Sequence, residues 1–340
     1  MSENPRAGNS ASAAPFFSVV IPSRGEDAKL LPLLDALARQ SLPRDRFEVI
    51  VVFDGAEPSG AVGARIANLG ARALMLEARR GPGAARNRGA AEARGAWLAF
   101  TEDDCIPETD WLERAAARLA VEPDLDALLG STNLPDGRPA RRPDGDGPHY
   151  LPTNLFVRRD LFHRVGGYCE DFFDPQRGIY FREDSDFGFT LEERGARVGV
   201  EPSARVTHPI EHSRYLDPLR WARRYEMDAL LRARHPRRFR ERIEVHRLGP
   251  LTVRRPFVRA CFACVLALTA AGTSVLVGEA GLAASFALVA LVAFLPIWAK
   301  WRFELFGLPV YTVVPPLLVF SYLRGLARAR RGTPRAEVLG

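Results

Sequence analysis

Short apolar runs alternate with segments of helical spacing over the first two thirds of the chain. The runs FFSVVIP, FEVIVVFDG, RALMLEA and AWLAFTEDD have the length and composition of buried strands. Between them lie helical patterns such as KLLPLLDALARQ and GAARNRGAAEARG. Strand, helix, strand, helix predicts an α/β fold, in which a mainly parallel sheet is flanked by helices.

Three apolar blocks follow near the C-terminus, at residues 260–277, 280–299 and 308–323. A membrane span needs about 20 apolar residues, with about 17 as the lower limit, so the first two blocks are long enough. The third is short and contains Pro309, Pro315 and Pro316. We expect it to be broken, and either re-entrant or interfacial. A buried helical hairpin in a soluble domain is the alternative, which apolarity on all sides disfavours.

Basic residues flank the first two blocks on one side only. Arg254, Arg255 and Arg259 precede the first block, and Lys300 and Arg302 follow the second. The positive-inside rule then places the preceding part of the chain in the cytoplasm, at the inner membrane of a multi-pass protein. If the third block crossed, the arginines after it would lie outside, so the sequence predicts two crossings.

These patterns predict five parts. They are a disordered lead at 1–15 without the apolar region of a signal peptide, an α/β domain at 16–212, a basic amphipathic and interfacial helical segment at 213–256, a membrane region at 257–323 and a basic tail at 324–340. Within the α/β domain, the Pro-, Gly- and Arg-rich stretch 134–149 predicts a mobile loop.

Charge and cysteine content limit the classes of partner that the chain could bind. The formal charge of +6 comes almost wholly from arginine, and residues 213–260 are densely basic. Such a run suits nucleic acid or an anionic membrane, and its position directly before an apolar region favours the membrane. The four cysteines have no disulfide or zinc spacing, and Cys261 and Cys264 are expected to act as small hydrophobes.

Three acids follow the strand AWLAF directly: Glu102, Asp103 and Asp104. Oxygen ligands of this kind suit Mg²⁺ or Mn²⁺, and such a cation would hold a diphosphate. The alternative is a solvated acidic turn that leads into the next helix.

A second acidic group, Glu183-Asp184-Ser185-Asp186, opens a helical run. A carboxylate there serves either as a general base or as a helix cap, and Asp184 and Asp186 are both candidates for either role.

Other polar residues follow strands or open a helix. The segment GPGAARN has Arg86 where a dinucleotide fingerprint needs glycine, which leaves a phosphate contact or an ordinary capped helix. His208 follows the run ARVT, either as a metal ligand or as a structural histidine. Asp54 closes VIVVF, either as a contact to a base or ribose or as a turn residue.

Together these segments resemble the membrane-anchored, bacterial type of family 2 glycosyltransferase with the GT-A fold. The resemblance is carried by VVIPSRGE, EVIVVFDG, RGPGAARNRGAAEARGAWLAFTEDDCIP, TNLFVRRDLFHRVGGY and REDSDFGFTLEERG, and it covers residues 16–212.

The resemblance implies roles for individual residues. Asp184 would be the catalytic base; Asp54, Arg86, Asn87 and Asp103 would bind the donor nucleotide; Asp104, Glu102 and His208 would hold Mg²⁺ or Mn²⁺; and Asn154 and Glu183 would lie on the acceptor side. It also implies an inverting transfer from a nucleotide-diphosphate sugar to a hydroxyl group.

The C-terminal blocks point to a lipid-linked or cell-envelope glycan as the acceptor, with membrane lipids as further partners and no nucleic acid. Two alternatives are a membrane-anchored nucleotidyltransferase and a GT-A-like binding protein that has lost catalysis. The intact Asp104 and Asp184 argue against the second alternative.

Overall fold

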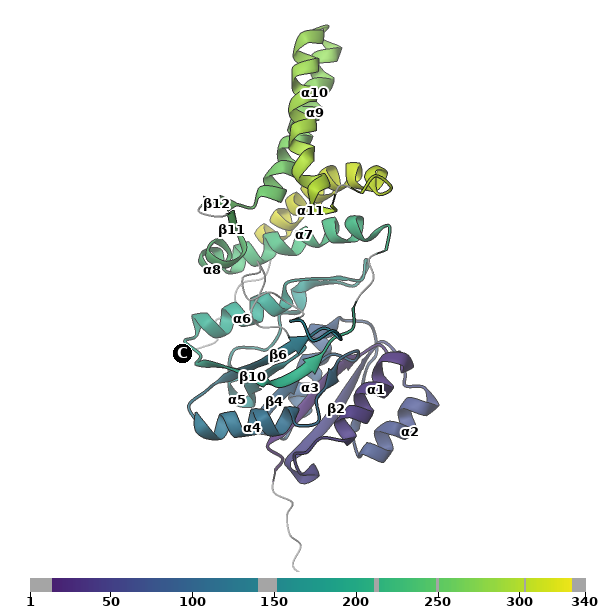
Figure 1. The fold of residues 1–340 in the computed structure, drawn as a ribbon, viewed down its shortest axis with the longest axis vertical. Coiled ribbons are helices and arrows are strands. Elements are labelled where there is room, and N and C mark those ends of the chain that lie inside the picture. The colour runs from purple at the N-terminus through teal and green to yellow at the C-terminus, as the bar shows by residue number, and fades with distance from the viewer. Residues whose placement is uncertain (1–13, 140–151, 211–213, 249–250, 303, 332–340) are drawn as a thin grey trace, which may run out of the picture. The chain divides into compact units, whose positions relative to one another are not determined.

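The structure is a computed structural model that describes residues 14–139, 152–210, 214–248, 251–302 and 304–331 (Figure 1). The predicted lead, apart from residues 14 and 15, most of the predicted 134–149 loop and the end of the predicted tail lie outside these ranges. The chain forms two compact units that do not follow chain order. The first contains residues 1–140, 152–167 and 196–209, and the second contains residues 141–151, 168–195 and 210–340. The expected domain boundary at residue 212 stays a prediction.

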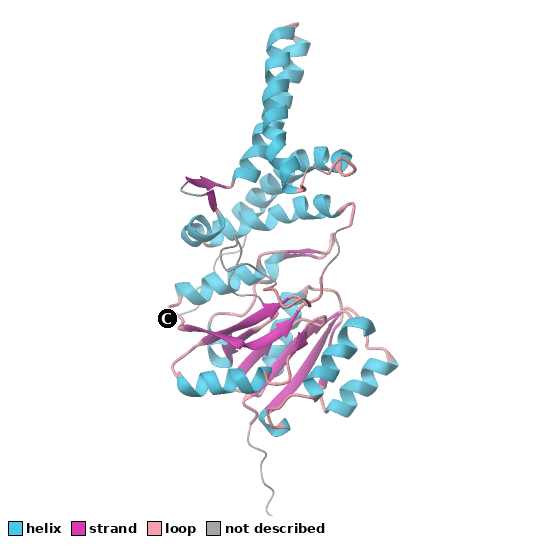
Figure 2. Ribbon diagram, in the orientation of Figure 1, coloured by secondary structure: helices cyan, strands magenta, loops and turns pink. Residues whose placement is uncertain are grey.

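The first unit is built on an eight-stranded sheet (Figure 2). Its order is β3-β2-β1-β4-β7-β6-β10-β5. The strands are β1 (Phe17–Ser23), β2 (Phe47–Asp54), β3 (Arg72–Leu76), β4 (Trp97–Phe100), β5 (Ile106–Pro107), β6 (Ala127–Asn133), β7 (Leu155–Arg158) and β10 (Val198–Thr207). β1, β2, β3 and β4 pair in parallel, as do β6 and β10, whereas β7 is antiparallel to both β4 and β6. The α/β fold is confirmed, with β7 reversed in the middle of the sheet and the short β5 reversed at its edge.

Helices cover both faces of this sheet. They are α1 (Asp27–Ala38), α2 (Gly60–Leu69), α3 (Pro82–Glu92), α4 (Trp111–Val121) and α5 (Arg159–Arg164). Alternate residues of β1 point to opposite faces. Val19 and Ile21 pack in one core with α1, α2 and α4. Val20 faces α3, where a β-carbon added to Gly89 would stand 2.4 Å from its Cγ1 atom. Glycine therefore lets α3 lie against the strands, and this fixes the helix beside the ends of β2 and β4.

The second unit is mainly helical. Its elements are β8 (Phe173–Asp174), β9 (Ile179–Tyr180), α6 (Glu183–Glu193), α7 (Asp217–Arg234), α8 (Pro236–Arg238), a π-helical turn at Phe239–Ile243, β11 (Val245–Leu248), β12 (Leu251–Arg254), α9 (Pro256–Leu276), α10 (Ala280–Lys300) and α11 (Leu308–Arg331). The predicted interfacial segment 213–256 therefore contains α7 and a short β-hairpin.

Three helices of this unit, α9, α10 and α11, are long and apolar enough to cross a membrane. α9 and α10 form a hairpin whose two arms lie side by side (Figure 1). In α10, only 11% of the most apolar stretch of the helix is buried, whereas in α11 the buried share is 50%. α10 thus presents its apolar surface to its surroundings, whereas α11 packs on protein.

α11 is a continuous helix through Pro315 and Pro316, so the break expected there is wrong. It lies along α7, where a β-carbon added to Gly325 would stand 2.2 Å from the backbone oxygen of Glu226. Arg324 and Arg328 form ion pairs with the Glu226 carboxylate at 3.4 and 3.5 Å. Close backbone packing and these ion pairs compensate for the backbone hydrogen bonds that the prolines cannot make.

A buried charge cluster joins three segments of the second unit. Asp228 on α7 is fully buried and accepts a hydrogen bond from Arg182 Nε at 2.7 Å and another from Arg255 Nη2. Arg182 directly precedes α6 and has a left-handed backbone, with a φ of 74°. Arg255 directly precedes α9. This cluster, which sequence reasoning missed, fixes the starts of α6 and α9 on α7.

Candidate active site

The acidic segment lies at the carboxyl end of the sheet, directly after β4. Because β1 and β4 are parallel neighbours, their ends meet, and Asp103 accepts a hydrogen bond from Ser23 Oγ at 2.7 Å. The Arg24 amide lies 3.4 Å from the same carboxylate oxygen. Burial raises the pKa of Asp103 and the neighbouring Asp104 charge adds to this, although the Ser23 hydrogen bond opposes it. Ser23 was not among the predicted site residues, and its place at a strand end was the available signal.

Glu102 faces the buried guanidinium of Arg86. Arg86, on α3, is 1% exposed, and its Nη2 lies 3.0 Å from Glu102 Oε1. Burial raises the pKa of Glu102, and the charge of Asp104 adds to this, while the charge of Arg86 lowers it. Even with Lys29, whose charge also acts on Asp103, the three carboxylates keep an excess of negative charge, which a bound cation would relieve.

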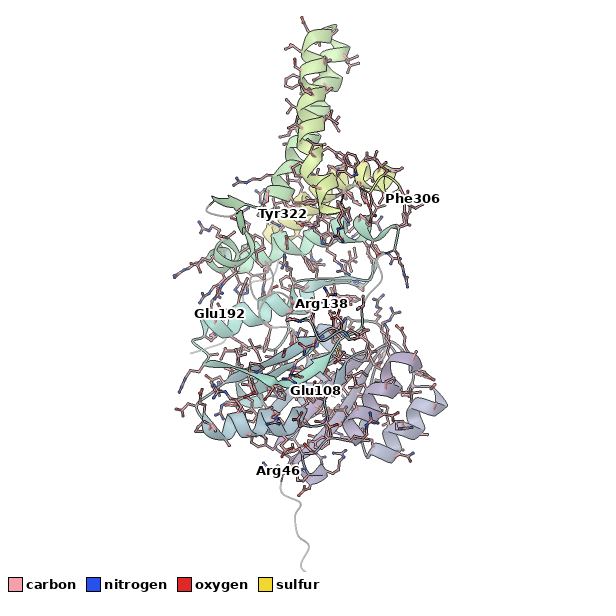
Figure 3. The ribbon with its side chains drawn as sticks, in the orientation of Figure 1. Arg46, Glu108, Arg138, Glu192, Phe306 and Tyr322 are labelled. Carbon is pink, nitrogen blue, oxygen red and sulfur yellow. The ribbon has the colours of Figure 1, made fainter. Side chains whose placement is uncertain are left out.

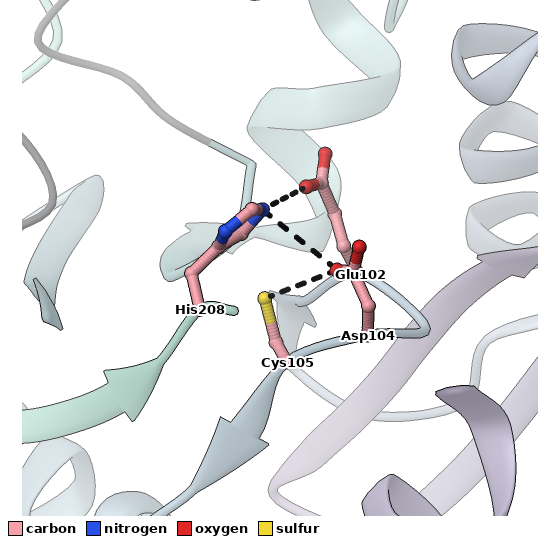
Figure 4. A group of neighbouring side chains, drawn as sticks. All are labelled: Glu102, Asp104, Cys105 and His208. Atoms are coloured by element: carbon pink, nitrogen blue, oxygen red, sulfur yellow. Dashed lines mark hydrogen bonds and ion pairs between the residues drawn. The ribbon is translucent and has the colours of Figure 1, made fainter. Parts of the chain in front are cut away.

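His208 completes the cluster from the end of β10 (Figure 4). Its Nδ1 lies 2.8 Å from the carbonyl oxygen of Pro209. Since a carbonyl only accepts, we assign the proton to Nδ1. Its Nε2 then presents a lone pair toward Glu102 Oε2 and Asp104 Oδ1, each at 3.8 Å. A hydrogen bond from the other ring nitrogen that orients the imidazole in this way is typical of metal-binding histidines.

The donor atoms fit a divalent cation. One ligand atom from each of Glu102, Asp104, Cys105 and His208 lies within 4.8 Å of all the others. The Cys105 thiol is buried, and burial followed by the charges of Glu102 and Asp104 raises its pKa. Thiolates favour softer metals, so the two carboxylates and the imidazole are the ligands that suit a hard divalent cation. Carboxylates suit Mg²⁺ or Mn²⁺, and the residues fit the predicted metal.

Asp54, at the end of β2, holds the loop that precedes α3. Its two carboxylate oxygens accept hydrogen bonds from the backbone amides of Arg80 and Gly81, at 2.6 and 2.9 Å. Asn87 lies one residue after Arg86 on α3, and its Oδ1 would be 2.6 Å from a β-carbon added to Gly167. The nucleotide contacts of Asp54 and Asn87 stay predictions.

Asn154 has a structural place in the fold. It is 2% exposed, and its Nδ2 donates to the carbonyl oxygens of Ser131 and Ala204 at 2.9 and 2.8 Å. Its Oδ1 accepts from Trp111 Nε1 at 2.8 Å. These bonds use both of its N–H groups to tie three segments together. They do not support the predicted acceptor-side role, which stays untested.

The second acidic group belongs to the second unit, in the first turn of α6. Asp186 is 2% exposed, with Arg234 Nε at 2.6 Å and His235 Nε2 at 3.0 Å from its Oδ1. Asp184 is partly exposed, and its Oδ1 accepts from the Ser185 amide at 2.6 Å. Glu183 is buried. Of the two aspartates left open by the sequence, Asp186 is thus committed to a structural cluster.

A cavity of about 560 Å³ lies at the opposite, amino-terminal end of the strands, with Phe47, Glu48 and Arg94 among its lining residues. It is separate from the acidic cluster described above.

Comparison with known proteins identifies the domain. Residues 18–169 match the glycosyl transferase family 2. Glycosyltransferase AglE of Haloferax volcanii is 28% identical over 209 residues, 56% of this chain and 68% of that protein. Succinoglycan biosynthesis protein ExoO of Rhizobium meliloti is 28% identical over 261 residues, 65% and 72% of the two chains. A PGL/p-HBAD biosynthesis glycosyltransferase of Mycobacterium tuberculosis is 36% identical over 169 residues, 46% and 64% of the two chains.

Solved structures share the fold. S. aureus TarS 1-349 in complex with UDP has a TM-score of 0.51 at 17% identity and covers 94% of this chain and 92% of that one. The mannosyltransferase PcManGT from Pyrobaculum calidifontis, in complex with GDP-Man and Mn²⁺, has a TM-score of 0.52 at 18% identity, with 92% and 87% covered. At this identity the likeness shows the fold alone. Residues 18–169 thus form a glycosyl transferase family 2 domain, within a unit that has the GT-A fold.

Proposed function

We propose that this chain transfers a sugar from a nucleotide-diphosphate sugar to a hydroxyl group of a lipid-linked or cell-envelope glycan, with a divalent metal and with inversion. The observation that carries the proposal is the convergence of Glu102, Asp104 and His208 at the carboxyl end of the sheet. Complexes of similar folds with UDP, and with GDP-Man and Mn²⁺, support a nucleotide-sugar donor.

Glu102, Asp104 and His208 would hold Mg²⁺ or Mn²⁺. The metal, when bound, supplies positive charge for the diphosphate that leaves the sugar. Asp103, which Ser23 orients, would accept a hydrogen bond from the ribose of the donor. Asp54 fixes the loop at residues 80 and 81, directly before α3. Arg86 and Asn87, in the middle of that helix, would contact the donor nucleotide.

Asp184 would accept the proton of the acceptor hydroxyl. Its carboxylate is oriented by the Ser185 amide at the start of α6, and it is more exposed than the neighbouring Glu183 and Asp186. Attack by the deprotonated hydroxyl on the face opposite the leaving diphosphate inverts the anomeric centre. One base is sufficient for this course, because no carboxylate nucleophile or covalent intermediate is required.

We further propose that α9 and α10 cross the inner membrane with the catalytic domain in the cytoplasm. An aromatic cluster marks the base of this hairpin: Trp221 lies 5.0 Å from Phe257 and 6.0 Å from Trp301 between ring centroids. Lys300 Nζ lies 3.4 Å from the Trp221 centroid. Aromatic and basic side chains at one level are typical of a membrane interface. The start of α9 and the end of α10 thus reach the same side.

α11 would lie in this interface rather than cross. It runs along α7 for most of its length: Phe306, just before it, lies 5.1 Å from Tyr215 between ring centroids, and Tyr322 OH accepts from Arg232 Nη1 at 3.1 Å. Phe306 and Tyr322 are labelled in Figure 3. A helix that follows α7 in this way stays at the level of α7, which agrees with the two crossings predicted from charge.

The test is release of nucleoside diphosphate from UDP-, GDP- and dTDP-sugars by the detergent-purified full chain, with Mn²⁺ or Mg²⁺ and with EDTA. We expect metal-dependent release from one donor when acceptor lipid extract is present. Asp104→Asn and Asp184→Asn should abolish it. Asp110→Asn, which removes a surface carboxylate paired with Arg114 at 2.8 Å, is the matched control and should keep it.

Calorimetry separates the role of Asp104 in holding the metal from the role of Asp184 as the base. Asp104→Asn should lose metal-dependent binding of the donor nucleotide, whereas Asp184→Asn should bind it as the parent does and fail only in transfer. Donor binding without transfer, in the presence of acceptor extract, would favour the non-catalytic alternative. Metal-independent release would contradict the role of the cluster.

A further inference from the structure

A basic cavity lies at the start of the first candidate span. Its volume is about 410 Å³, within the range of about 300–1,000 Å³ that is usual for ligand pockets. The lining residues are Arg232, Arg240, Glu244, Arg255, Val258, Arg259, Phe262 and Tyr322. They come from the end of α7, the π-helical turn, the first two turns of α9 and the middle of α11, which are all parts of the second unit.

Two of the four arginines are committed to protein partners. Arg255 binds the buried Asp228, and Arg232 donates to Tyr322 OH and lies 3.8 Å from Glu244 Oε1. The other two, Arg240 and Arg259, are exposed, and neither pairs with a carboxylate in the described part of the chain. A guanidinium group binds a phosphate through two parallel hydrogen bonds. The cavity therefore has unmatched positive charge of the kind that binds phosphate.

The cavity continues into an apolar stripe on α9. Arg259, Phe262 and Leu266 follow one another at helical spacings of three and four residues, so they lie on one face. Leu266 is 68% exposed. The helix begins at Pro256, and its N-terminal end adds a partial positive charge beside Arg259. A ligand with a phosphate at Arg259 would thus find hydrocarbon surface along the proposed span.

We propose that this cavity binds the phosphate group of an anionic membrane lipid, with the lipid chain along Phe262 and Leu266. Arg240 and Arg259 would hold the phosphate, and Arg232 would add charge from α7. The inference rests on the proposed function only in the orientation of the span and in the identity of the lipid. Both an ordinary anionic phospholipid and a polyprenyl phosphate that carries the acceptor have this chemistry.

The experiment measures lipid binding to the detergent-solubilised full chain by native mass spectrometry. The probes are phosphatidylglycerol, a polyprenyl phosphate, phosphatidylcholine and inorganic phosphate. Arg240→Gln and Arg259→Gln should each weaken binding of the two anionic lipids about fivefold, and the double variant about 25-fold, because each basic residue near a membrane surface contributes about 1 kcal/mol. Arg223→Gln removes one exposed arginine of α7 outside the cavity and should bind as the parent does.

Each outcome decides part of the proposal. Unchanged binding in the double variant, with thermal stability equal to the parent, would overturn it, as would equal binding of phosphatidylcholine. If inorganic phosphate bound as tightly as the lipids, the role of Phe262 and Leu266 would be wrong. Preference for polyprenyl phosphate over phosphatidylglycerol would identify an acceptor site, and the reverse preference a site for bulk lipid.

The lipid measurement needs no donor and no transfer. Asp184→Asn should lose transfer and keep lipid binding. The double variant should lose lipid binding and still release nucleoside diphosphate when a short water-soluble acceptor takes the sugar. This pair of results would show that the two sites are independent. Failure of the transferase proposal would leave the lipid result standing.

Discussion

Replacing Asp228 with asparagine tests how far the second unit depends on its buried charge cluster. The Asp228 side chain is 0% exposed, and those of Arg182 and Arg255 are 11% and 10% exposed. The variant keeps the shape of the side chain and one acceptor oxygen. Among the residues that the structure describes, it leaves two nearly buried guanidinium groups without a negative partner in contact. Their hydration cannot be restored without opening the packing of α7.

The expected loss follows from this burial. Removing one partner of a buried ion pair costs about 3–5 kcal/mol, and the remaining amide oxygen places this variant near the lower end. At about 2–4 °C for each kcal/mol in a unit of 150–250 residues, a loss of about 3 kcal/mol lowers the unfolding temperature by about 6–12 °C.

The assay is thermal unfolding of the detergent-purified full chain, followed by tryptophan fluorescence. Asp217→Asn is the matched control on α7, because its pair with Arg220 at 3.4 Å is exposed on both sides and such pairs contribute about 0–1 kcal/mol. An Asp228→Asn unfolding temperature as close to the parent as that of the control would contradict a stabilising role of the Asp228 carboxylate. It would mean that water already solvates the two arginines.

Three further predictions concern the first unit. Gly89→Ala should destabilise the fold by about 1–3 kcal/mol, because the new methyl group would collide with Val20. Gly63→Ala should stabilise the fold slightly, because nothing lies within 4 Å of the added β-carbon. Thermal unfolding of the two variants measures the difference. Asn154→Ala should lower the unfolding temperature, because buried hydrogen bonds are lost, and should leave the KM for the acceptor unchanged. An unchanged unfolding temperature with a raised KM for the acceptor would instead support the predicted acceptor-side role. Burial opposes ionisation of Glu48, but hydrogen bonds from a backbone amide, a hydroxyl and a guanidinium group lower its pKa, so its contribution to stability is complete above about pH 4.3 and is lost as the pH falls through the lower folded-state pKa. The unfolding temperature of Glu48→Gln should therefore fall less steeply on acidification than that of the parent. An equally steep fall in both proteins would contradict this.

Local pattern was sufficient for much of the first unit. The β1, β2 and β4 runs are wholly buried, so composition alone identified them. The rule that ligands bind at the carboxyl ends of strands singled out Asp103 and Asp104, whose roles stay predictions. The reversed β7 was not predicted, because its place between β4 and β6 depends on pairing partners far along the chain.

Long-range pairing also explains what the sequence left open. The choice between Asp184 and Asp186 depends on Arg234 and His235, which lie 48 and 49 residues after Asp186. The pair between Arg182 and Asp228 spans 46 residues, and no local spacing signals it. The prolines of α11 gave a misleading local signal because packing on α7 outweighed their cost.

The turn between α9 and α10 has a consequence for biogenesis. Only residues 277–279 separate the two helices, and Glu279 is their one charged member. Under the proposed topology the hairpin enters the bilayer as a single unit, and one carboxylate is the only formal charge carried to the far leaflet. The folded catalytic domain never has to be translocated, and the arginines before α9 stay on the side where the ribosome delivers them.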